Sequence, residues 1–321
     1  MINTCHLKWG IGAPVRVLKR ALKRTFRSPP RPMKKLNFFL VAGAEVECPI
    51  CARNTRLFIS RYPSWESPFD FFVLNWCELC GSGWLPDAKR VMDDYYRKTY
   101  TATVEPNRNQ DPEIFFNDWK YFDYNLRCGK AVRASKQRDF LVSHGASFQT
   151  VFDFGCGPGY FLRICGAPYR FGYELDEASV RHLQFLGVEN ISPLDLPTAA
   201  VDTMLASQSL EHIFPEELDF YLSNLRRALK PEGRFYVEVP NAGLSWFLDS
   251  DNHDPHTIFF TAEGLERLLT RFNFKSIYRG YENGSTAFDP HPEPIYTPDS
   301  SNEFWSTRDH SSIIMIVTTQ E

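Results

Sequence analysis

A short glycine-rich segment constrains the fold of this chain more than any other feature. Residues 151–162 read Val-Phe-Asp-Phe-Gly-Cys-Gly-Pro-Gly-Tyr-Phe-Leu, so an apolar run leads into Asp153 and then into three alternate glycines, Gly155, Gly157 and Gly159. Glycines let a ligand approach the backbone closely, and Pro158 suits the first turn of a helix. The segment predicts a strand–turn–helix crevice of the kind that holds nucleotides in open α/β sheets.

The spacing of these glycines bears on the charge of the ligand. A dinucleotide fingerprint is Gly-x-Gly-x-x-Gly, whereas here the third glycine comes one residue early and Asp153 precedes the first. A carboxylate at this place would repel a phosphate but suits a ligand that carries an amino group. The segment therefore favours a nucleoside with an amino group over a pyrophosphate cofactor.

The residues after 150 alternate short apolar runs with helical patterns, which predicts a parallel sheet covered on both faces. The expected strands are Thr150–Phe154, Tyr169–Glu174, Val201–Ala206, Arg234–Val239, Phe274–Tyr281 and Ser311–Thr318. The expected helices are Tyr160–Cys165, Glu177–Leu186, Pro215–Leu229 and Ala262–Arg271. Lys230-Pro-Glu-Gly233 is expected to end a helix before the next strand.

Residues 150–280 resemble class I S-adenosylmethionine-dependent methyltransferases, whose first motif is (Asp/Glu)-x-Gly-x-Gly-x-Gly. The resemblance implies a Rossmann-like sheet of seven strands, in the order 3-2-1-4-5-7-6, with the last strand antiparallel. It also implies that Glu174 accepts both ribose hydroxyls, and that Asp195 and Leu196 contact the adenine. Ser207, in a segment that resembles the fourth strand, is expected at the cofactor as well. The cofactor residues are then Asp153, Gly155, Gly157, Gly159, Glu174, Asp195, Leu196 and Ser207.

Four of the eight cysteines form two Cys-x-x-Cys pairs, Cys48 with Cys51 and Cys77 with Cys80. Two such pairs provide the four thiolates that tetrahedral zinc favours, and Gly81 can form the tight turn that such a pair needs. Four protein ligands leave no open position on the ion, so the sequence predicts a structural zinc ribbon. A redox or iron–sulfur site is the alternative.

Methyl transfer to a hydroxyl is helped by a general base, and histidine suits this role near neutral pH. His212 and His256 fall where the resembling family builds its acceptor pocket, and we expect one of them to act as base or to orient the acceptor. Glu211-His212 also resembles the Glu-x-x-Glu-His motif of ubiquinone-biosynthesis and small-RNA methyltransferases, which holds Mg²⁺. Gln208 stands at the first acidic position, which puts a Mg²⁺ site in doubt and favours a structural Glu-His helix start.

The first 35 residues contain ten Lys and Arg and no Asp or Glu, while the whole chain has 36 basic and 39 acidic residues. Val15, Leu18, Leu22 and Phe26 are spaced as one face of a short amphipathic helix. Such an arm can bind an anionic membrane surface, can bind RNA, or can pack on its own protein as a plain extension. No apolar run is long enough to span a membrane.

Together these patterns divide the chain into four parts. We expect a basic arm at 1–44, a zinc ribbon at 45–87, a helical linker or cap at 88–147 and a methyltransferase domain at 148–321. The function expected is methylation of a small-molecule hydroxyl, on a sugar or glycan by analogy with ribbon-bearing relatives, in the cytoplasm or at the inner membrane face. The alternatives are an RNA methyltransferase, which the acidic body opposes, and a zinc-stapled binding scaffold without activity.

Overall fold

A computed structural model describes residues 41–61, 72–98, 106–117, 130–243, 256–283 and 311–319. The chain divides into two compact units, Met1–Asn37 and Phe38–Glu321, and every described residue belongs to the second. The amphipathic helix expected in the arm therefore lies outside the described residues. Among the helices that the structure describes, none has the length and apolar character needed to cross a membrane.

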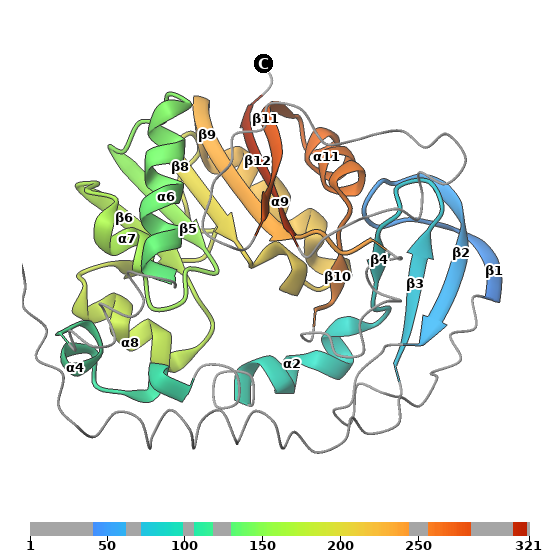
Figure 1. Ribbon diagram of the computed structural model, residues 1–321, viewed down its shortest axis with the longest axis horizontal. Helices are drawn as coiled ribbons and strands as arrows, with labels where there is room; N and C mark the ends of the chain where they lie inside the picture. Colours follow the sequence, from blue (N-terminus) through green and yellow to red (C-terminus); the bar gives the residue numbers. More distant parts are fainter. Residues whose placement is uncertain are drawn as a thin grey trace, which may run out of the picture. The chain divides into compact units, whose positions relative to one another are not determined.

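A seven-stranded sheet forms the centre of the second unit (Figure 1). Its strands are β5 (Thr150–Phe154), β6 (Tyr169–Tyr173), β7 (Glu189–Asn190), β8 (Val201–Ser207), β9 (Leu229–Pro240), β11 (Phe274–Asn283) and β12 (Ser311–Thr319). They lie in the order β11-β12-β9-β8-β5-β6-β7, and β12 runs antiparallel to both of its neighbours. Numbered along the chain, this is the order 3-2-1-4-5-7-6 with an antiparallel last strand, so the predicted Rossmann-like topology is confirmed.

Helices cover the two faces of this sheet as two separate apolar cores. The helices are α6 (Lys130–Ser143), α7 (Tyr160–Ile164), α8 (Glu177–Phe185), α9 (Leu218–Ala228) and α11 (Ala262–Arg271). Phe152 and Phe154 pack with α9 and α11, whereas Val151, which precedes them and points to the opposite face, packs with α6, α7 and α8. Because successive strand residues point to opposite faces, this arrangement explains the near-continuous apolar runs of the central strands.

Two sequence-based boundaries are wrong and one strand was missed. The helix expected over 215–229 is a 3₁₀ turn, η4 (Pro215–Glu217), followed by α9. Lys230-Pro-Glu-Gly233 does not separate helix from strand but lies within β9, where the register to β8 shifts and Glu232 has φ 60°. The third strand, β7, has only two residues, too few to give an alternating pattern.

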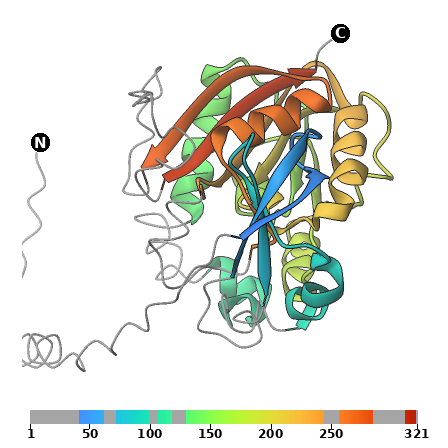
Figure 2. The same cartoon turned by 90° about the vertical axis from the view of Figure 1, so that its right-hand side faces the viewer.

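A second, antiparallel sheet carries the cysteine pairs, and Figure 2 looks onto it. Its strands are β1 (Val41–Glu47), β2 (Asn54–Arg61), β3 (Val73–Cys77), β4 (Gly83–Trp84) and β10 (Ile258–Phe259). β2, β3 and β4 come from the segment expected to be the ribbon, and β1 begins four residues before it, in the expected arm. β10 comes from the body and pairs with β4. Cys48, Cys77 and Cys80 also belong to the same core cluster as α9 and α11. The cysteine-bearing sheet is thus built onto the body through backbone pairing and a shared core.

The segment between the two sheets supplies α2 (Ala88–Lys98), η2 (Pro106–Asn109) and α4 (Pro112–Asn117). Lys89 of α2 donates to Glu216 and Glu217 at the start of the α9 region, which ties α2 to the body. Phe115 of α4 lies against the His182 ring of α8 at 4.4 Å between centroids. Asp93 of α2 and Arg108 of η2 line a pocket together with residues that follow the parallel strands, so this segment lies at that end of the sheet. The assignment of 88–147 as a linker or cap stays a prediction.

Candidate active site

The glycine loop turns from β5 into α7 with a backbone that only glycine adopts easily. Gly155, Gly157 and Gly159 have φ values of 68°, 54° and 84°. A Cβ on Gly155 would stand 2.4 Å from the Cβ of Ser209, in the loop after β8, and one on Gly159 would stand 2.9 Å from Leu183. The glycines therefore form the tight turn that the sequence predicted. They also allow close contacts with two neighbouring elements.

Glu174 follows β6 and faces the glycine loop. Its carboxylate accepts hydrogen bonds from the backbone N–H groups of Gly157 at 2.8 Å, Leu175 at 2.7 Å and Asp176 at 2.9 Å. Its own backbone is held by the side chain of Asn190 in β7, through two hydrogen bonds of 3.0 and 3.1 Å. The short strand β7 thus fixes the place of this carboxylate. With three of its about four acceptor positions occupied, it can accept one ribose hydroxyl directly, and a second only in exchange for a backbone N–H.

Asp153 lies at the base of the loop with 6% of its surface exposed. Burial, together with the charge of Glu174, raises the pKa of Asp153 to about 8. Burial also raises the pKa of the neighbouring Cys156 thiol well above its usual value. An ionised Asp153 is therefore costly in the protein alone, and a cationic group placed nearby would favour it.

One pocket opens between the carboxyl ends of the strands and the α2–η2 segment. Its lining residues are Asp93, Arg108, Phe154, Gly155, Tyr173, Glu174, Leu175, Asp176, Gln208, Ser209, His212, Ile213, Phe214, Glu217 and Tyr221. Three predicted site residues line it, namely Gly155, Glu174 and His212. The pocket joins the predicted cofactor side to the predicted acceptor side.

The apolar wall of this pocket escaped the sequence analysis. Phe154 and Tyr173 stack with ring centroids 5.3 Å apart, and the hydroxyl of Tyr173 lies 3.1 Å from that of Tyr221 on α9. Flat aromatic surfaces of this kind accommodate a planar base. The available signal was the aromatic residue at the end of each of two neighbouring strands.

Arg108 of η2 was also missed, and it places a positive charge at the glycine loop. One of its terminal nitrogens lies 3.2 Å from where a Cβ on Gly157 would be, and the other donates to the Ser179 hydroxyl at 3.2 Å. The pocket thus has a cation at one side of the loop and carboxylates at the other. No sequence pattern ties residue 108 to a loop that lies so far along the chain.

The remaining predicted cofactor residues lie outside the lining of the pocket. Leu196 is buried and Asp195 is exposed, and Arg227 holds their turn by donating to the carbonyl oxygens of Leu196 and Leu194. Ser207 donates to the carboxylate of Glu238 at 3.0 Å. Their contacts with a cofactor stay predictions.

Glu238 is the centre of a buried polar network beneath the pocket. This fully buried carboxylate accepts hydrogen bonds from Gln137 at 2.8 Å, Tyr236 at 3.0 Å and Gln208 at 3.3 Å, besides Ser207. Gln208 donates in addition to Ser312 of β12 at 3.0 Å. The network holds the loop after β8, in which Gln208 has φ 55°, against β9 and β12.

The structure brings both predicted catalytic histidines together. His212 ends the short 3₁₀ turn η3 (Leu210–His212), and His256 precedes β10, with their ring centroids 4.8 Å apart. Glu211 stands beside them, and one donor atom from each of the three residues lies within 4.8 Å of the others. Burial lowers the pKa of His212 to about 4, so its imidazole is neutral at pH 7. The carboxylate–imidazole cluster lies next to the pocket, since His212 forms part of the lining.

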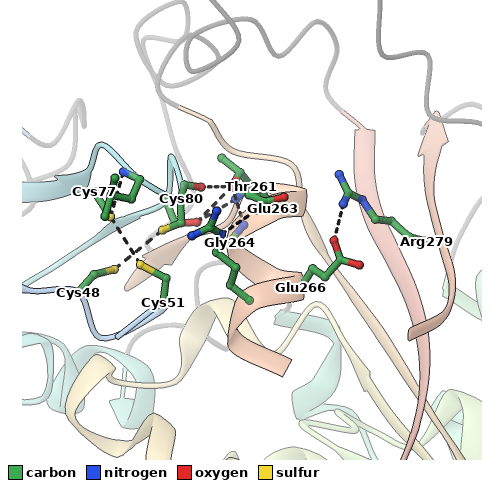
Figure 3. A network of polar contacts seen from close by, with 12 residues as sticks. Cys48, Cys51, Cys77, Cys80, Thr261, Glu263, Gly264, Glu266 and Arg279 are labelled. Atoms are coloured by element: carbon green, nitrogen blue, oxygen red, sulfur yellow. Dashed lines mark hydrogen bonds and ion pairs between the residues drawn. The ribbon is translucent and has the colours of Figure 1, made fainter. Parts of the chain in front are cut away.

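The four cysteines of the second sheet also converge. Sγ of Cys48 lies 3.9 Å from that of Cys80, and Sγ of Cys51 lies 3.8 Å from that of Cys77 (Figure 3). Four sulfurs bound to one zinc ion at about 2.3 Å in a tetrahedron are about 3.8 Å apart, so the set fits this metal. Gly81 turns the second pair with φ 70°. None of these four cysteines forms a disulfide.

The cysteine site is joined directly to α11. The hydroxyl of Thr261, the N-cap of α11, donates to the carbonyl oxygen of Cys80 at 2.5 Å, and Arg271 at the other end of α11 donates to the carbonyl oxygen of Pro49 at 2.7 Å. In addition, Leu85 N–H donates to the carbonyl oxygen of Thr257 at 2.8 Å. The segment that carries His256 is therefore attached to the cysteine-bearing sheet on both sides of β10.

Comparisons with known proteins place the glycine loop in a recognised kind of domain. Residues 122–278 match the family model described as a methyltransferase domain. A probable S-adenosylmethionine-dependent methyltransferase of Mycolicibacterium smegmatis is 30% identical over 143 residues, which are 42% of this chain and 55% of that protein. A similarly named protein of Mycobacterium tuberculosis is 29% identical over 136 residues, 40% of this chain and 49% of the other. The chain thus spans about half the length of the curated relatives it matches.

A solved structure with similarity to this chain is 1,6-didemethyltoxoflavin-N1-methyltransferase of Burkholderia thailandensis, with 1,6-didemethyltoxoflavin and S-adenosylhomocysteine bound. It is 20% identical, and the similar region covers 59% of this chain and 78% of the other, with a TM-score of 0.41. The matched residues 122–278 of the family model include the glycine loop, Glu174 and the cluster of Glu211, His212 and His256.

Proposed function

We propose that this protein is an S-adenosylmethionine-dependent methyltransferase. The observation that carries the proposal is the glycine loop with the carboxylate of Glu174 fixed opposite it, within a region that matches a methyltransferase domain. In the reaction, a lone pair of the acceptor attacks the methyl carbon, and the carbon–sulfur bond breaks with its electron pair left on sulfur. The products are the methylated acceptor, S-adenosylhomocysteine and a proton.

The charges around the loop support this cofactor. Its amino-acid end carries an ammonium and a carboxylate, and the loop has a buried carboxyl, Asp153, and a guanidinium, Arg108, within reach of such groups. Glu174 offers acceptor oxygens for the ribose, and the stacked rings of Phe154 and Tyr173 offer an apolar wall. Methyl transfer depends mainly on alignment, so a rigid cradle of this kind is the principal requirement on the protein.

We further propose that the acceptor is a hydroxyl of a small molecule, such as a sugar or glycan intermediate, and that it enters from the His212 side. His212 lines the pocket and His256 stands behind it, so one of them can take the hydroxyl proton or orient the acceptor. The sugar assignment follows the analogy with ribbon-bearing methyltransferases. The described part of the body contributes aromatic and acidic groups to the pocket, which suit a neutral acceptor better than a polyphosphate chain.

The four cysteines are proposed to bind a structural zinc ion. The sulfur separations support this assignment, and four thiolates leave no position at which a substrate could bind. The role of such an ion would be to stabilise the cysteine-bearing sheet. The residues proposed to be ligands are Cys48, Cys51, Cys77 and Cys80.

The cofactor assignment is tested by calorimetric titration of S-adenosylhomocysteine into the zinc-replete protein and into Glu174→Ala. We expect the variant to bind at least about tenfold more weakly, equivalent to about 1.4 kcal/mol, because charge-assisted hydrogen bonding to the ribose is lost. Glu189→Ala is a matched control, since Glu189 is an exposed carboxylate at the nearby strand β7. Its affinity should equal that of the unmodified protein.

Absence of binding by the unmodified protein would overturn the enzyme assignment and favour the binding-scaffold alternative. Binding that Glu174→Ala leaves unchanged would mean that the ribose lies elsewhere in the pocket.

A further inference from the structure

We propose that Glu211, His212 and His256 form a second metal site, and that it takes a divalent first-row transition ion and not Mg²⁺. One carboxylate oxygen and one nitrogen from each imidazole lie within 4.8 Å of one another. This cluster is separate from the four cysteines, which form their own group of candidate ligands.

The separations fit a shared ion after a small closure. Ligand atoms that each lie about 2.1 Å from one ion are at most about 4.2 Å apart, so the three side chains need to approach by less than about 1 Å. Rotation about the side-chain bonds of two histidines and a glutamate provides that movement without a change of backbone.

The backbone that carries these ligands is already fixed. The carbonyl oxygen of Glu211 accepts hydrogen bonds from the N–H of Thr257 at 2.9 Å and from its hydroxyl at 3.0 Å. The same hydroxyl lies 2.6 Å from the carbonyl oxygen of Ile213. Thr257 therefore joins the segment of Glu211 and His212 to that of His256, although the two are more than 40 residues apart in sequence. This is the outer support that metal ligands need.

The donor set decides the kind of ion. Mg²⁺ prefers an octahedron of oxygen ligands, whereas two imidazoles with one carboxylate suit zinc, cobalt, iron and manganese. The residue at the first acidic position of the Mg²⁺-binding motif is Gln208, and its amide is engaged by Glu238 and Ser312. The Mg²⁺-binding motif would have a second glutamate at the position of Gln208, whereas the third side chain of this cluster is His256 from a distant segment. The residues present therefore do not fit the Mg²⁺ site.

The position of the site suggests its use, and this step rests on the proposed methyl transfer. His212 lines the pocket together with Ser209 and Gly155, so a metal held there borders the place where the transferable methyl group is expected. Three protein ligands would leave coordination positions open, and a hydroxyl bound at one of them would release its proton to solvent more easily. His212 and His256 would then act on the acceptor as ligands of the ion and not as free bases.

The test is a titration of Co²⁺ into the full-length protein loaded with one zinc ion per chain, which the four cysteines are expected to hold, followed by calorimetry and visible absorption. We expect one Co²⁺ per chain, with ligand-field bands typical of nitrogen and oxygen donors and without an intense sulfur-to-cobalt charge-transfer band. Glu211→Gln and His256→Ala should each weaken binding by about tenfold or more. Because His256 is buried, His212→Gln at the half-buried position is a third variant that disturbs packing less. Glu189→Gln is the control and should bind as the unmodified protein does.

Three outcomes would overturn the proposal: no Co²⁺ bound beyond the zinc present, equal binding by all variants, or displacement of Co²⁺ by an equal concentration of Mg²⁺. Titration of S-adenosylhomocysteine into the same samples separates this question from the proposed function. If the ligand variants lose Co²⁺ but still bind S-adenosylhomocysteine, the site is supported. If the unmodified protein binds Co²⁺ but no S-adenosylhomocysteine, the site is supported and the methyltransferase assignment is overturned.

Discussion

The two sides of the pocket are built in different ways. Most of the cofactor side comes from one continuous stretch, β5 to the start of α8, whose parts contact one another through parallel strands and a tight loop. Arg108 of η2 and Tyr221 of α9 are added to it from outside this stretch. The acceptor side combines η3 with the residues around β10, and both depend on contacts with the cysteine-bearing sheet, which lies far earlier in the sequence.

This difference indicates which perturbations should separate the two sides. The cofactor side rests on β5, β6 and β8 in the interior of the seven-stranded sheet, and no strand of the cysteine-bearing sheet pairs with them. The acceptor side has His256 one residue before Thr257, whose carbonyl oxygen accepts a hydrogen bond from Leu85. Damage to the cysteine site should therefore reach the acceptor side first and leave cofactor binding largely intact.

The largest expected effect follows from removal of one cysteine. Cys77→Ser should abolish stable metal retention and disorder β3 and β4, because the small sheet depends on its four-thiolate site for stability. Trp76 and Trp84, both buried in this sheet, should become solvent-exposed, which tryptophan emission detects as a red shift. Calorimetry should find S-adenosylhomocysteine affinity within about threefold of the unmodified protein, under about 0.7 kcal/mol.

Cys165→Ser is the matched control, since Cys165 is a buried cysteine of the body on the opposite face of the large sheet. It should retain the metal and the tryptophan emission. If Cys77→Ser lost both the metal and the affinity for S-adenosylhomocysteine, the cofactor side would also depend on the cysteine site. The two sides of the pocket could then not be perturbed independently, contrary to what the hydrogen bonds indicate.

A smaller effect is expected at the base of the glycine loop. The pKa of Asp153 is about 8 in the folded protein and close to 3.8 in an unfolded chain, so the folded state keeps a proton that the unfolded state loses. The contribution of that proton to stability is complete below pH 4 and disappears as the pH rises through 8. Asp153→Asn removes this dependence and should stabilise the protein alone by about 1–3 kcal/mol at pH 8.

Urea unfolding at pH 5 and at pH 8 measures this difference. The advantage of Asp153→Asn over the unmodified protein should be larger at pH 8, while its affinity for S-adenosylhomocysteine should fall about tenfold because the ammonium loses a carboxylate. An advantage that is equal at both pH values would show that Asp153 does not hold its proton in the folded state.

Much of the cofactor side could be predicted from sequence because its determinants are local. The turn at Gly155, Gly157 and Gly159 is specified by three residues within five positions, and Glu174 follows the next strand directly. Alternating and continuous apolar runs likewise predicted the long strands and, with the family resemblance, their order. The failures fall where local pattern is weak, as at β7, which has two residues, and at the irregular start of β9.

The acceptor side could be predicted only as separate parts. His212 and His256 were identified singly, and the cysteine pairs were identified as a site, but nothing in the sequence indicates that β10 pairs with β4 or that Thr257 joins both histidine segments. Arg108 and the Glu238 network were missed for the same reason, since their partners lie dozens of residues away. Contacts between distant segments are set by tertiary packing and leave no periodic signal.

The smallest expected effect tests the hydrogen bond that joins the two sheets beside the acceptor side. The Thr261 hydroxyl accepts the N–H of Gly264 as the N-cap of α11 and donates to the carbonyl oxygen of Cys80. Thr261→Ala removes both interactions and should lower the free energy of unfolding by about 1 kcal/mol, a shift in the melting temperature of about 2–4 °C. Thr261→Ser keeps the hydroxyl and should restore most of this loss. Affinity for S-adenosylhomocysteine should not change in either variant, because α11 contributes no residue to the pocket lining. If Thr261→Ala lost affinity and Thr261→Ser restored it, the cofactor side would also depend on the cysteine-bearing sheet.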